Sequence, residues 1–234
     1  NLAATDQTTD TPTNNFATLR IAQSPQHAQV VLSEGNCDFD FTGGGSISAR
    51  RFDQHVVSNF AMTTGKWYCE AKEIESWRAC FFGISNLSTK DVTTEIESWI
   101  AIYGDTGDKY IQEYTGESVS NSAHGDAIGA NATILIALDM DNKNVYFGQR
   151  LDSGEPGWSD GSDFNQSSPT SAISISSDFL TIDGDGSSVV FYFAGGGSSA
   201  TPRFQVNFGN PVQSITSGNA DANGYGNFEC TVPS

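Results

Sequence analysis

The apolar residues of this chain come in short runs, and Gly, Ser, Thr, Asn and Asp separate one run from the next. No segment longer than about 12 residues shows the 3.6-residue periodicity of an amphipathic helix. The nearest candidate is residues 90–103, where a strand is at least as good an interpretation because the segment is rich in β-branched and aromatic residues. Short strands at regular spacing predict an all-β fold, a sandwich of two antiparallel sheets.

Residues 65–85, GKWYCEAKEIESWRACFFGIS, carry the strongest strand signal. Trp67, Cys69 and Ala71 alternate with their neighbours in the period of two that is typical of a strand with one buried face. Residues 79–84 form a continuous apolar run, as in a strand covered on both faces. Polar residues separate the two runs, so we predict that the two strands pair as an antiparallel hairpin near the middle of a sheet.

Similar patterns predict two further hairpins and several single strands. Residues 28–32 and 37–41 flank the turn sequence Ser-Glu-Gly-Asn, and residues 127–140 and 145–149 flank Asp-Asn-Lys-Asn. Residues 151–169 are polar and rich in Gly and Ser, so we expect a long surface loop there. Single strands are expected at residues 109–114, 171–175, 189–194 and 204–208.

The 234 residues suffice for one domain with a sizeable core. Residues 1–15 are polar and lack periodicity, and we expect them to form an extended N-terminal arm or linker. Residues 16–210 are assigned to the sandwich. Residues 211–234 form a C-terminal segment rich in Gly and Asn, for which packing back onto the sandwich is one open arrangement.

The formal net charge is −17, from 11 Lys and Arg against 28 Asp and Glu. So acidic a chain repels phosphate backbones and anionic membranes, which argues against nucleic acid as a partner. No stretch approaches the roughly 18 apolar residues of a membrane-spanning helix, so we expect no membrane insertion.

Four cysteines leave the redox state open. Cys69 and Cys80 lie about equally far from the predicted turn, so a cross-strand disulfide is one hypothesis and a pair of buried thiols is the favoured one. Cys37 and Cys230 would need the two ends of the chain to meet. No CxxC or Cys/His spacing suggests a zinc site.

Four motifs, in order and at matching spacing, resemble motifs of the SPRY domain. They are GKWYCE at residues 65–70, FGIS at 82–85, LDMDNKNVYF at 138–147 and FQVNFG at 204–209. The resemblance covers residues 16–209. It implies a concanavalin-like jelly-roll sandwich that binds partners through loops at one end and is not itself a catalyst. Residues 131–134 and 151–169 depart from the family pattern.

The segments beside this domain show a narrower likeness. Residues 11–19 (TPTNNFATL) and 221–228 (DANGYGNF) resemble segments that flank SPRY domains in structural proteins of tailed phages, especially marine phages. This resemblance implies a non-enzymatic virion surface protein, namely a homo-oligomeric tail fibre, capsid fibre or decoration module. Its partners would be virion proteins, or a protein or glycan of the host surface. A concanavalin-like glycan-degrading enzyme and a SPRY adaptor of non-viral origin are the alternatives.

Two sequence features would suit an enzyme. Residues 157–161, GWSDG, match the GxSxG nucleophile elbow, but loop sequence surrounds them where a hydrolase has a strand and then a helix. The alternating carboxylates Glu73 with Glu75, and Glu95 with Glu97, would suit a glycosidase on a sheet face. Solvent-facing strand ends explain these carboxylates better, so we predict no enzymatic activity.

Two acidic turns offer the hard oxygen ligands that Ca²⁺ prefers. One contains Asp183 and Asp185, and the other spans residues 139–142. Neither completes an EF-hand loop, because no Glu stands at the twelfth position. A hairpin turn accounts for residues 139–144. For Asp183 and Asp185 an ordinary turn is the favoured interpretation and a Ca²⁺ site is the alternative; no other cofactor is expected.

Tryptophans at strand ends or in expected loops indicate where the chain binds a partner. An indole in such a place can stack on a sugar ring or anchor a protein. An arginine beside one of them can pair with a carboxylate of the partner. The predicted binding residues are Trp77, Arg78, Trp99 and Trp158, with at least one of the tryptophans expected in the core.

Overall fold

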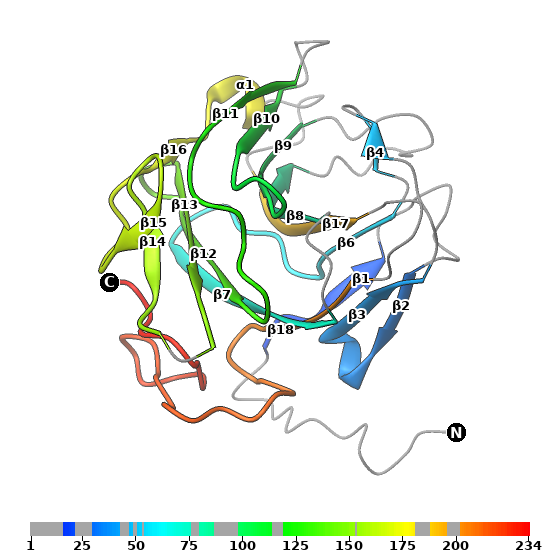
Figure 1. Ribbon diagram of the computed structural model, residues 1–234, viewed down its shortest axis with the longest axis vertical. Coiled ribbons are helices and arrows are strands. Elements are labelled where there is room, and N and C mark those ends of the chain that lie inside the picture. The colour runs from blue at the N-terminus through cyan, green and yellow to red at the C-terminus, as the bar shows by residue number, and fades with distance from the viewer. Residues whose placement is uncertain are drawn as a thin grey trace.

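Two antiparallel β-sheets form the body of the protein in the computed structural model (Figure 1). The structure describes residues 16–21, 30–42, 47–48, 51–52, 54–75, 80–86, 98–113, 119–152, 154–180, 188–195 and 202–234. The predicted fold class, an all-β sandwich of two antiparallel sheets, is confirmed. The expected arm at residues 1–15 lies outside the described residues.

One sheet has seven strands in the order β1-β6-β17-β8-β9-β10-β11, and every neighbouring pair is antiparallel. Its strands are β1 (Leu19–Ile21), β6 (Gln54–Ser58), β17 (Val190–Gly195), β8 (Cys80–Asn86), β9 (Ser98–Tyr103), β10 (Lys109–Gln112) and β11 (Ser120–Ser122). Residues 98–103 are therefore a strand, as their β-branched and aromatic content favours. The rest of the segment considered for a helix, residues 90–97, is outside the described ranges.

The second sheet has nine strands. Eight follow the order β15-β14-β13-β12-β7-β18-β3-β2, and β16 pairs with β13. Its strands are β2 (Val30–Ser33), β3 (Asp38–Phe41), β7 (Lys66–Glu75), β12 (Thr133–Asp139), β13 (Asn144–Arg150), β14 (Gly157–Ser159), β15 (Phe164–Gln166), β16 (Ile173–Ser174) and β18 (Arg203–Asn207). A separate two-stranded sheet joins β4 (Ile47–Ser48) to β5 (Arg51–Phe52). The described helices are the short η3 (Glu34–Asn36) and α1 (Ser177–Leu180).

The predicted hairpin between β7 and β8 is wrong, although both strands exist. β7 pairs with β12 and β18 in the nine-stranded sheet, whereas β8 pairs with β17 and β9 in the seven-stranded sheet. The chain thus crosses from one sheet to the other between these strands. The alternation predicted for β7 is confirmed, because Trp67, Cys69 and Ala71 all pack into the core between the sheets.

Strands from the end of the chain occupy the middle of both sheets. β17 lies between β6 and β8, and β18 lies between β7 and β3. The aromatic rings of the core meet around these two strands. The ring centroids of Phe39 on β3 and Phe193 on β17 are 5.5 Å apart. Those of Phe82 on β8 and Phe204 on β18 are 5.0 Å apart. The late strands therefore connect the two sheets as well as the two halves of each sheet.

Two predicted hairpins are confirmed. β2 and β3 pair across the Glu-Gly-Asn turn, where three successive residues, 34–36, adopt positive φ. β12 and β13 pair in register over their whole lengths. Their turn is held by Asp139, whose Oδ1 accepts the main-chain N–H groups of Asp141 and Asn142 at 3.1 and 2.9 Å. These side-chain contacts are typical of an Asx turn.

Residues 151–169 are more ordered than the long loop we expected. Two short strands, β14 and β15, pair as a hairpin within them and extend the nine-stranded sheet at its edge. Asp160 fixes the turn, because its Oδ1 accepts the main-chain N–H groups of Ser162 and Asp163, each at 2.8 Å. Among the described residues, no helix combines the length and the apolar character needed to cross a membrane.

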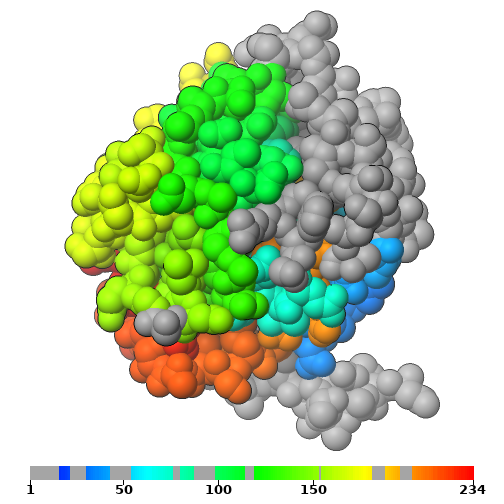
Figure 2. Space-filling view, viewed as in Figure 1, coloured from blue at the N-terminus to red at the C-terminus, as the bar shows by residue number. Residues whose placement is uncertain are grey.

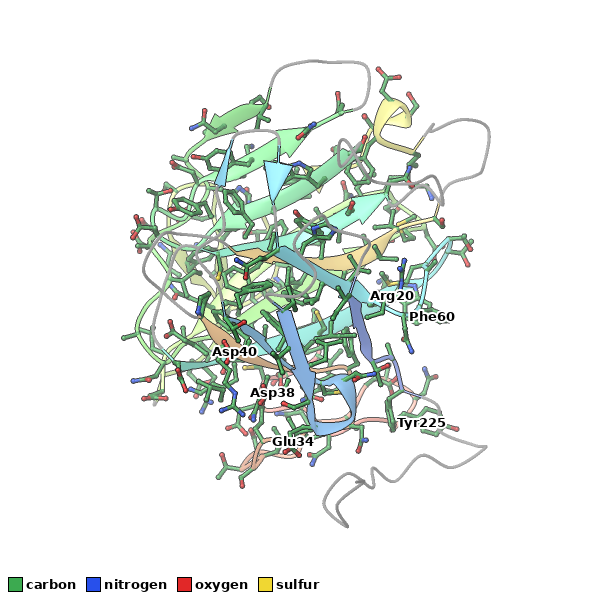
Figure 3. The ribbon with its side chains drawn as sticks, turned by 90° about the vertical axis from the view of Figure 1, so that its right-hand side faces the viewer. Arg20, Glu34, Asp38, Asp40, Phe60 and Tyr225 are labelled. Carbon is green, nitrogen blue, oxygen red and sulfur yellow. The ribbon has the colours of Figure 1, made fainter. Side chains whose placement is uncertain are left out.

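An ion pair between buried Asp38 and half-buried Arg203 joins β3 to β18 near one edge of the nine-stranded sheet. Figure 3 views this side, with Glu34 at the turn after β2 and with Asp38 and Asp40 on β3. Asp38 is almost fully buried, and its two oxygens accept Nε and Nη2 of Arg203, both at 2.9 Å. This bidentate geometry matches the planar guanidinium to the carboxylate. It fixes β18 against its neighbour β3.

Candidate functional site

The outer face of the seven-stranded sheet carries a cluster of aromatic side chains. Because residues alternate between the faces of a strand, Phe82 of β8 enters the core whereas Phe81 points to the outer face. We refer to the outward cluster as the aromatic face. It consists of Val57, Phe81, Trp99, Ala101, Val190, Tyr192 and Ala194, with Tyr103, Tyr110 and Val119 packed against it.

The rings of the aromatic face pack at the separations that favour aromatic contact. Phe81 stacks on Tyr103 with ring centroids 4.7 Å apart and meets Tyr110 edge-on at 5.2 Å. Trp99 lies edge-on to Phe81 at 5.5 Å, and its Nε1 donates a 2.7 Å hydrogen bond to Oε1 of Gln112. The cluster is thus closely packed, and the indole N–H of Trp99 is hydrogen-bonded within the sheet.

Burial across the aromatic face falls from its centre to one margin. Trp99 and Tyr192 have almost no exposed surface, whereas Tyr103 and Tyr110 are half-buried. Burial, and then the charge of nearby Asp105, raises the pKa of Tyr103, so its phenol stays protonated and can donate a hydrogen bond. We refer to Tyr103, Tyr110 and the exposed turn residues Asp105 and Thr106 as the aromatic rim. Among the described residues, this rim offers a partner two partly exposed aromatic rings beside an exposed polar turn.

Two of the predicted binding tryptophans are buried, so the expectation that at least one lies in the core is met, and neither indole is free to stack on a partner. Trp99 is 1% exposed at the centre of the aromatic face, and Trp158 is 2% exposed on β14 of the other sheet. The indole of Trp158 lies over Gly148, where an added Cβ would come within 3.1 Å of it. The structure therefore does not bring the two indoles together. Trp77 and Arg78 lie outside the described residues.

Ser159 and Glu73 are engaged in structural contacts, whereas Glu75 is exposed at the end of β7. Ser159 is 2% exposed on β14, where its hydroxyl donates to the main-chain oxygen of His124 and accepts the N–H of Gly161. The solvent-facing position expected for Glu73 is wrong: it is buried, and its Oε2 accepts the main-chain N–H of Asn131 at 2.6 Å. Neither side chain is presented to a substrate. Glu95 and Glu97 fall outside the described ranges.

The described part of the chain holds no cluster of three or more His, Cys, Asp or Glu side chains arranged for a metal ion. Both carboxylate oxygens of Asp139 accept hydrogen bonds within its own turn, and Oδ2 accepts one from Nδ2 of Asn142 at 2.8 Å. Asp141 accepts the N–H of Gly65 at 2.8 Å, which ties this turn to the start of β7. Asp183 and Asp185 are outside the described residues.

A second feature, on the nine-stranded sheet, escaped the sequence-based predictions. Glu70 of β7 points to the outer face of this sheet and is fully buried. Its carboxylate accepts four donors. They are the main-chain N–H groups of Glu229 (3.0 Å) and Cys230 (2.7 Å), the hydroxyl of Tyr68 (3.0 Å) and Nδ2 of Asn207 (3.1 Å). Burial raises the pKa of Glu70, although all four hydrogen bonds act to lower it.

The donors on Glu229 and Cys230 belong to the C-terminal segment, residues 211–234, which lies against this sheet. It appears in orange to red along the lower side of the molecule in Figure 2. Phe228 meets the ring of Tyr68 edge-on at 5.2 Å, and Cys230 packs with Trp158. We refer to Tyr68, Glu70, Arg150, Trp158 and Asn207, which receive the segment, as the Glu70 cradle. The alternation of β7 places Glu70 on this face, but no feature of the sequence near Glu70 indicates that the C-terminal segment covers it.

No protein-family model matches the sequence, and no curated protein matches it. Solved structures with a similar fold include the SPRY domain of human HERC1, at 14% identity and a TM-score of 0.47, over 79% of this chain and 94% of that chain. The stonustoxin structure matches at 12% identity with a TM-score of 0.46, over 82% of this chain and 27% of that chain. The TRIM65 PSpry domain matches at 10% identity with a TM-score of 0.45, over 82% of this chain and 92% of that chain. Identities this low say nothing about shared partners.

Proposed function

We propose that the protein is a non-enzymatic binding module of a phage virion surface, a tail fibre, capsid fibre or decoration protein, and that it binds a protein partner. The observation that carries the binding role is the aromatic rim. Half-buried Tyr103 and Tyr110 pack against the aromatic cluster behind them and stand beside the exposed turn residues Asp105 and Thr106. Aromatic rings backed by a packed core and edged by polar groups are typical anchors of protein interfaces.

Two sequence properties support the virion setting. Residues 11–19 and 221–228 resemble segments that flank SPRY domains in phage structural proteins. The net charge of −17 suits a protein that is displayed in many crowded copies and must stay soluble. Both properties are compatible with a homo-oligomeric particle component.

The state of the carboxylates supports a non-enzymatic role. Glu70 and Glu73 are buried, and both accept main-chain N–H groups of their own chain. A glycosidase needs a pair of carboxyl groups about 5–9 Å apart on either side of an accessible sugar ring. Carboxylates that are sealed in this way cannot reach a glycosidic bond.

The test is binding of labelled protein to intact host cells and, separately, to virions stripped of their fibres. Tyr110→Ala should weaken binding at least tenfold, because truncation of a tyrosine at an interface hot spot costs about 2 kcal/mol or more. Tyr225→Ala is the matched control, since this tyrosine is 56% exposed and lies on the C-terminal segment. Equal binding by both variants would contradict the proposal.

Three further arms identify the partner. Protease treatment of the target should abolish binding to a protein, whereas binding that survives it and is competed by host polysaccharide would reveal a glycan. Binding lost in EDTA would support the Ca²⁺ site proposed at Asp183 and Asp185. Release of reducing sugar from host polysaccharide would contradict a non-enzymatic role.

A further inference from the structure

Among the strands that the structure describes, the nine-stranded sheet ends at β2 (Figure 1). Main-chain groups of an antiparallel strand point alternately to its two neighbours. In β3, the N–H of Phe41 and the oxygen of Cys37 bond on the side of β18, at 3.1 and 2.7 Å. The alternate positions of β3 therefore bond to β2, and the register leaves the main-chain groups of Val30 and Leu32 pointing away from the sheet. We refer to β2 with these outward groups as the β2 edge.

The side chains of the β2 edge alternate between the core and the outer face of the sheet. Val30 is buried in the core and Leu32 packs against it, whereas Val31 is 49% exposed on the opposite face. In register, Val31 stands beside Asp40 of β3, and Asp40 stands beside Arg203 of β18. A strand added at the β2 edge would place one set of alternate side chains next to the core and the other set next to Val31.

The outer face beside the β2 edge is negatively charged. The carboxylates of Asp38, Asp40 and Glu75 lie around the guanidinium of Arg203, whose bidentate pair is with Asp38. Oδ1 of Asp40 is buried and has no hydrogen-bond partner among the described residues. Burial, and then the charge of Glu75, raises the pKa of Asp40, because the charge of Arg203 offsets these effects only in part. A further cation would give this oxygen a partner and reduce the repulsion.

Charge favours one kind of occupant for the β2 edge. Residues 1–15 of this chain contain two Asp and no Lys or Arg, so they cannot supply the cation. A second copy paired through β2 would bring two negatively charged faces together. A foreign segment with basic residues supplies what is missing, because a long basic side chain can lay its apolar stem over Val31 and direct its charged end toward Asp40.

We infer that the β2 edge binds an extended segment of a partner protein in which basic and apolar residues alternate. The segment adds a strand to the sheet, and its main chain pairs with Val30 and Leu32. Its apolar side chains extend the core beside Leu32, and its basic side chains pass over Val31 to Asp40. The net charge of −17 attracts such a segment. The inference does not depend on the partner of the aromatic rim, because the rim lies on the other sheet.

Titration of the isotopically labelled full chain with a synthetic peptide of alternating arginine and valine tests this inference by NMR. At about 0.15 M NaCl, where long-range attraction is screened, we expect saturable binding at one site and the largest shifts at the amides of Val30 and Leu32. In a control peptide, proline replaces each valine. This peptide keeps the charge but lacks N–H groups that a strand needs, so it should bind at least fivefold more weakly, an estimate of about that size for lost main-chain pairing.

Asp40→Asn should weaken binding of the arginine–valine peptide by about fivefold or more, because it removes the charge that the basic side chain meets. Asp40→Glu should retain most of the affinity. The matched control is Asp178→Asn, which changes the net charge equally at an exposed position of α1, away from β2 in Figure 1. Circular dichroism checks that each variant is folded.

Three results would overturn the inference. They are equal binding of the proline peptide, equal affinities of Asp40→Asn and Asp178→Asn, and no binding up to about 1 mM peptide. Dimerisation of the chain through the β2 edge, measured by analytical ultracentrifugation and strengthened by Asp40→Asn, would also overturn it, because the occupant would then be a second copy.

Discussion

The carboxylate of Glu70 accepts the main-chain N–H of Cys230 at 2.7 Å, although 160 positions separate the two residues. This bond, with its neighbour to Glu229, holds the end of the chain against the nine-stranded sheet. A single side chain on β7 thus contributes two of the hydrogen bonds that hold the C-terminal segment over the outer face of this sheet.

Glu70→Ala should release the C-terminal segment, residues 211–234, from the nine-stranded sheet while leaving the sandwich folded. Hydrogen bonds to a charged acceptor contribute about 1.5–3 kcal/mol each, so opening of this segment should become easier by about 3 kcal/mol. Amide hydrogen exchange at Glu229 and Cys230 should then be faster by about 100-fold, while exchange in β12 stays slow. Glu75→Ala, on the exposed end of the same strand, is the control. Unchanged exchange at the two amides would contradict the role of Glu70.

Gly83→Ala should destabilise the whole sandwich. A Cβ at Gly83 would lie 2.0 Å from the main-chain oxygen of Ile100 and 2.7 Å from Cβ of Ala101, so β8 and β9 would have to separate. We expect the free energy of unfolding to fall by roughly 1–3 kcal/mol, as for other overpacked cores. Gly154→Ala is the control, because its Cβ would meet only one atom, at 3.9 Å. Urea denaturation of both variants measures the difference.

Stability should fall as the pH drops below about 6.5, partly because of His124. Burial, and then the charge of Lys109, lowers the pKa of His124 from 6.5 to about 4. Between these values the unfolded chain binds a proton that the folded protein does not, so acidification favours unfolding. At pH 5 the effect amounts to about 2 kcal/mol. Urea denaturation at pH 7.5 and pH 5 measures how much free energy of unfolding is lost on acidification. The loss should be smaller for His124→Gln than for the unsubstituted protein; equal losses would contradict a role of His124.

All four cysteines should be unreactive thiols in the folded protein. They are free and buried, and burial raises the pKa of Cys37 to about 11 and that of Cys230 to about 12. Because the thiolate is the reactive species, a thiol reagent at pH 8 should modify none of them without denaturant and all four in denaturant. Rapid modification of the folded protein would contradict this prediction. A mass 2 Da below that of the reduced chain for each pair of cysteines would also contradict it, because it would reveal a disulfide.

The sequence predicts those parts of the fold that depend on neighbouring residues. Strand alternation and turn residues such as Asp139 are local properties, so the β2–β3 and β12–β13 hairpins could be predicted together with the inward face of β7. The pairing of β7 with β8 could not. The connection between them resembles a hairpin turn in composition, and only the packing of the complete sandwich sends the next strand to the other sheet.

The candidate site was harder to predict for the same reason. Trp158 stands in a Gly- and Ser-rich stretch that has the composition of a loop, yet β14 and the C-terminal segment bury it. Glu70 looks like an ordinary solvent-facing residue of an alternating strand, and its burial depends on residues near the end of the chain. Trp99 lies in a segment whose strand character could be predicted, but its place at the centre of the aromatic face depends on side chains from β8, β10 and β17.

The central positions of β17 and β18 have a consequence for biosynthesis. Until the ribosome has added residues 190–207, β6 has no link to β8 and β3 has none to β7, so each sheet exists as two unconnected halves with open edges. Loops of well over one hundred residues must then close together, which makes folding slow and exposes the nascent chain to aggregation. The sandwich should therefore fold only after residues 190–207 have been synthesised, and until then its open strand edges need shielding by chaperones.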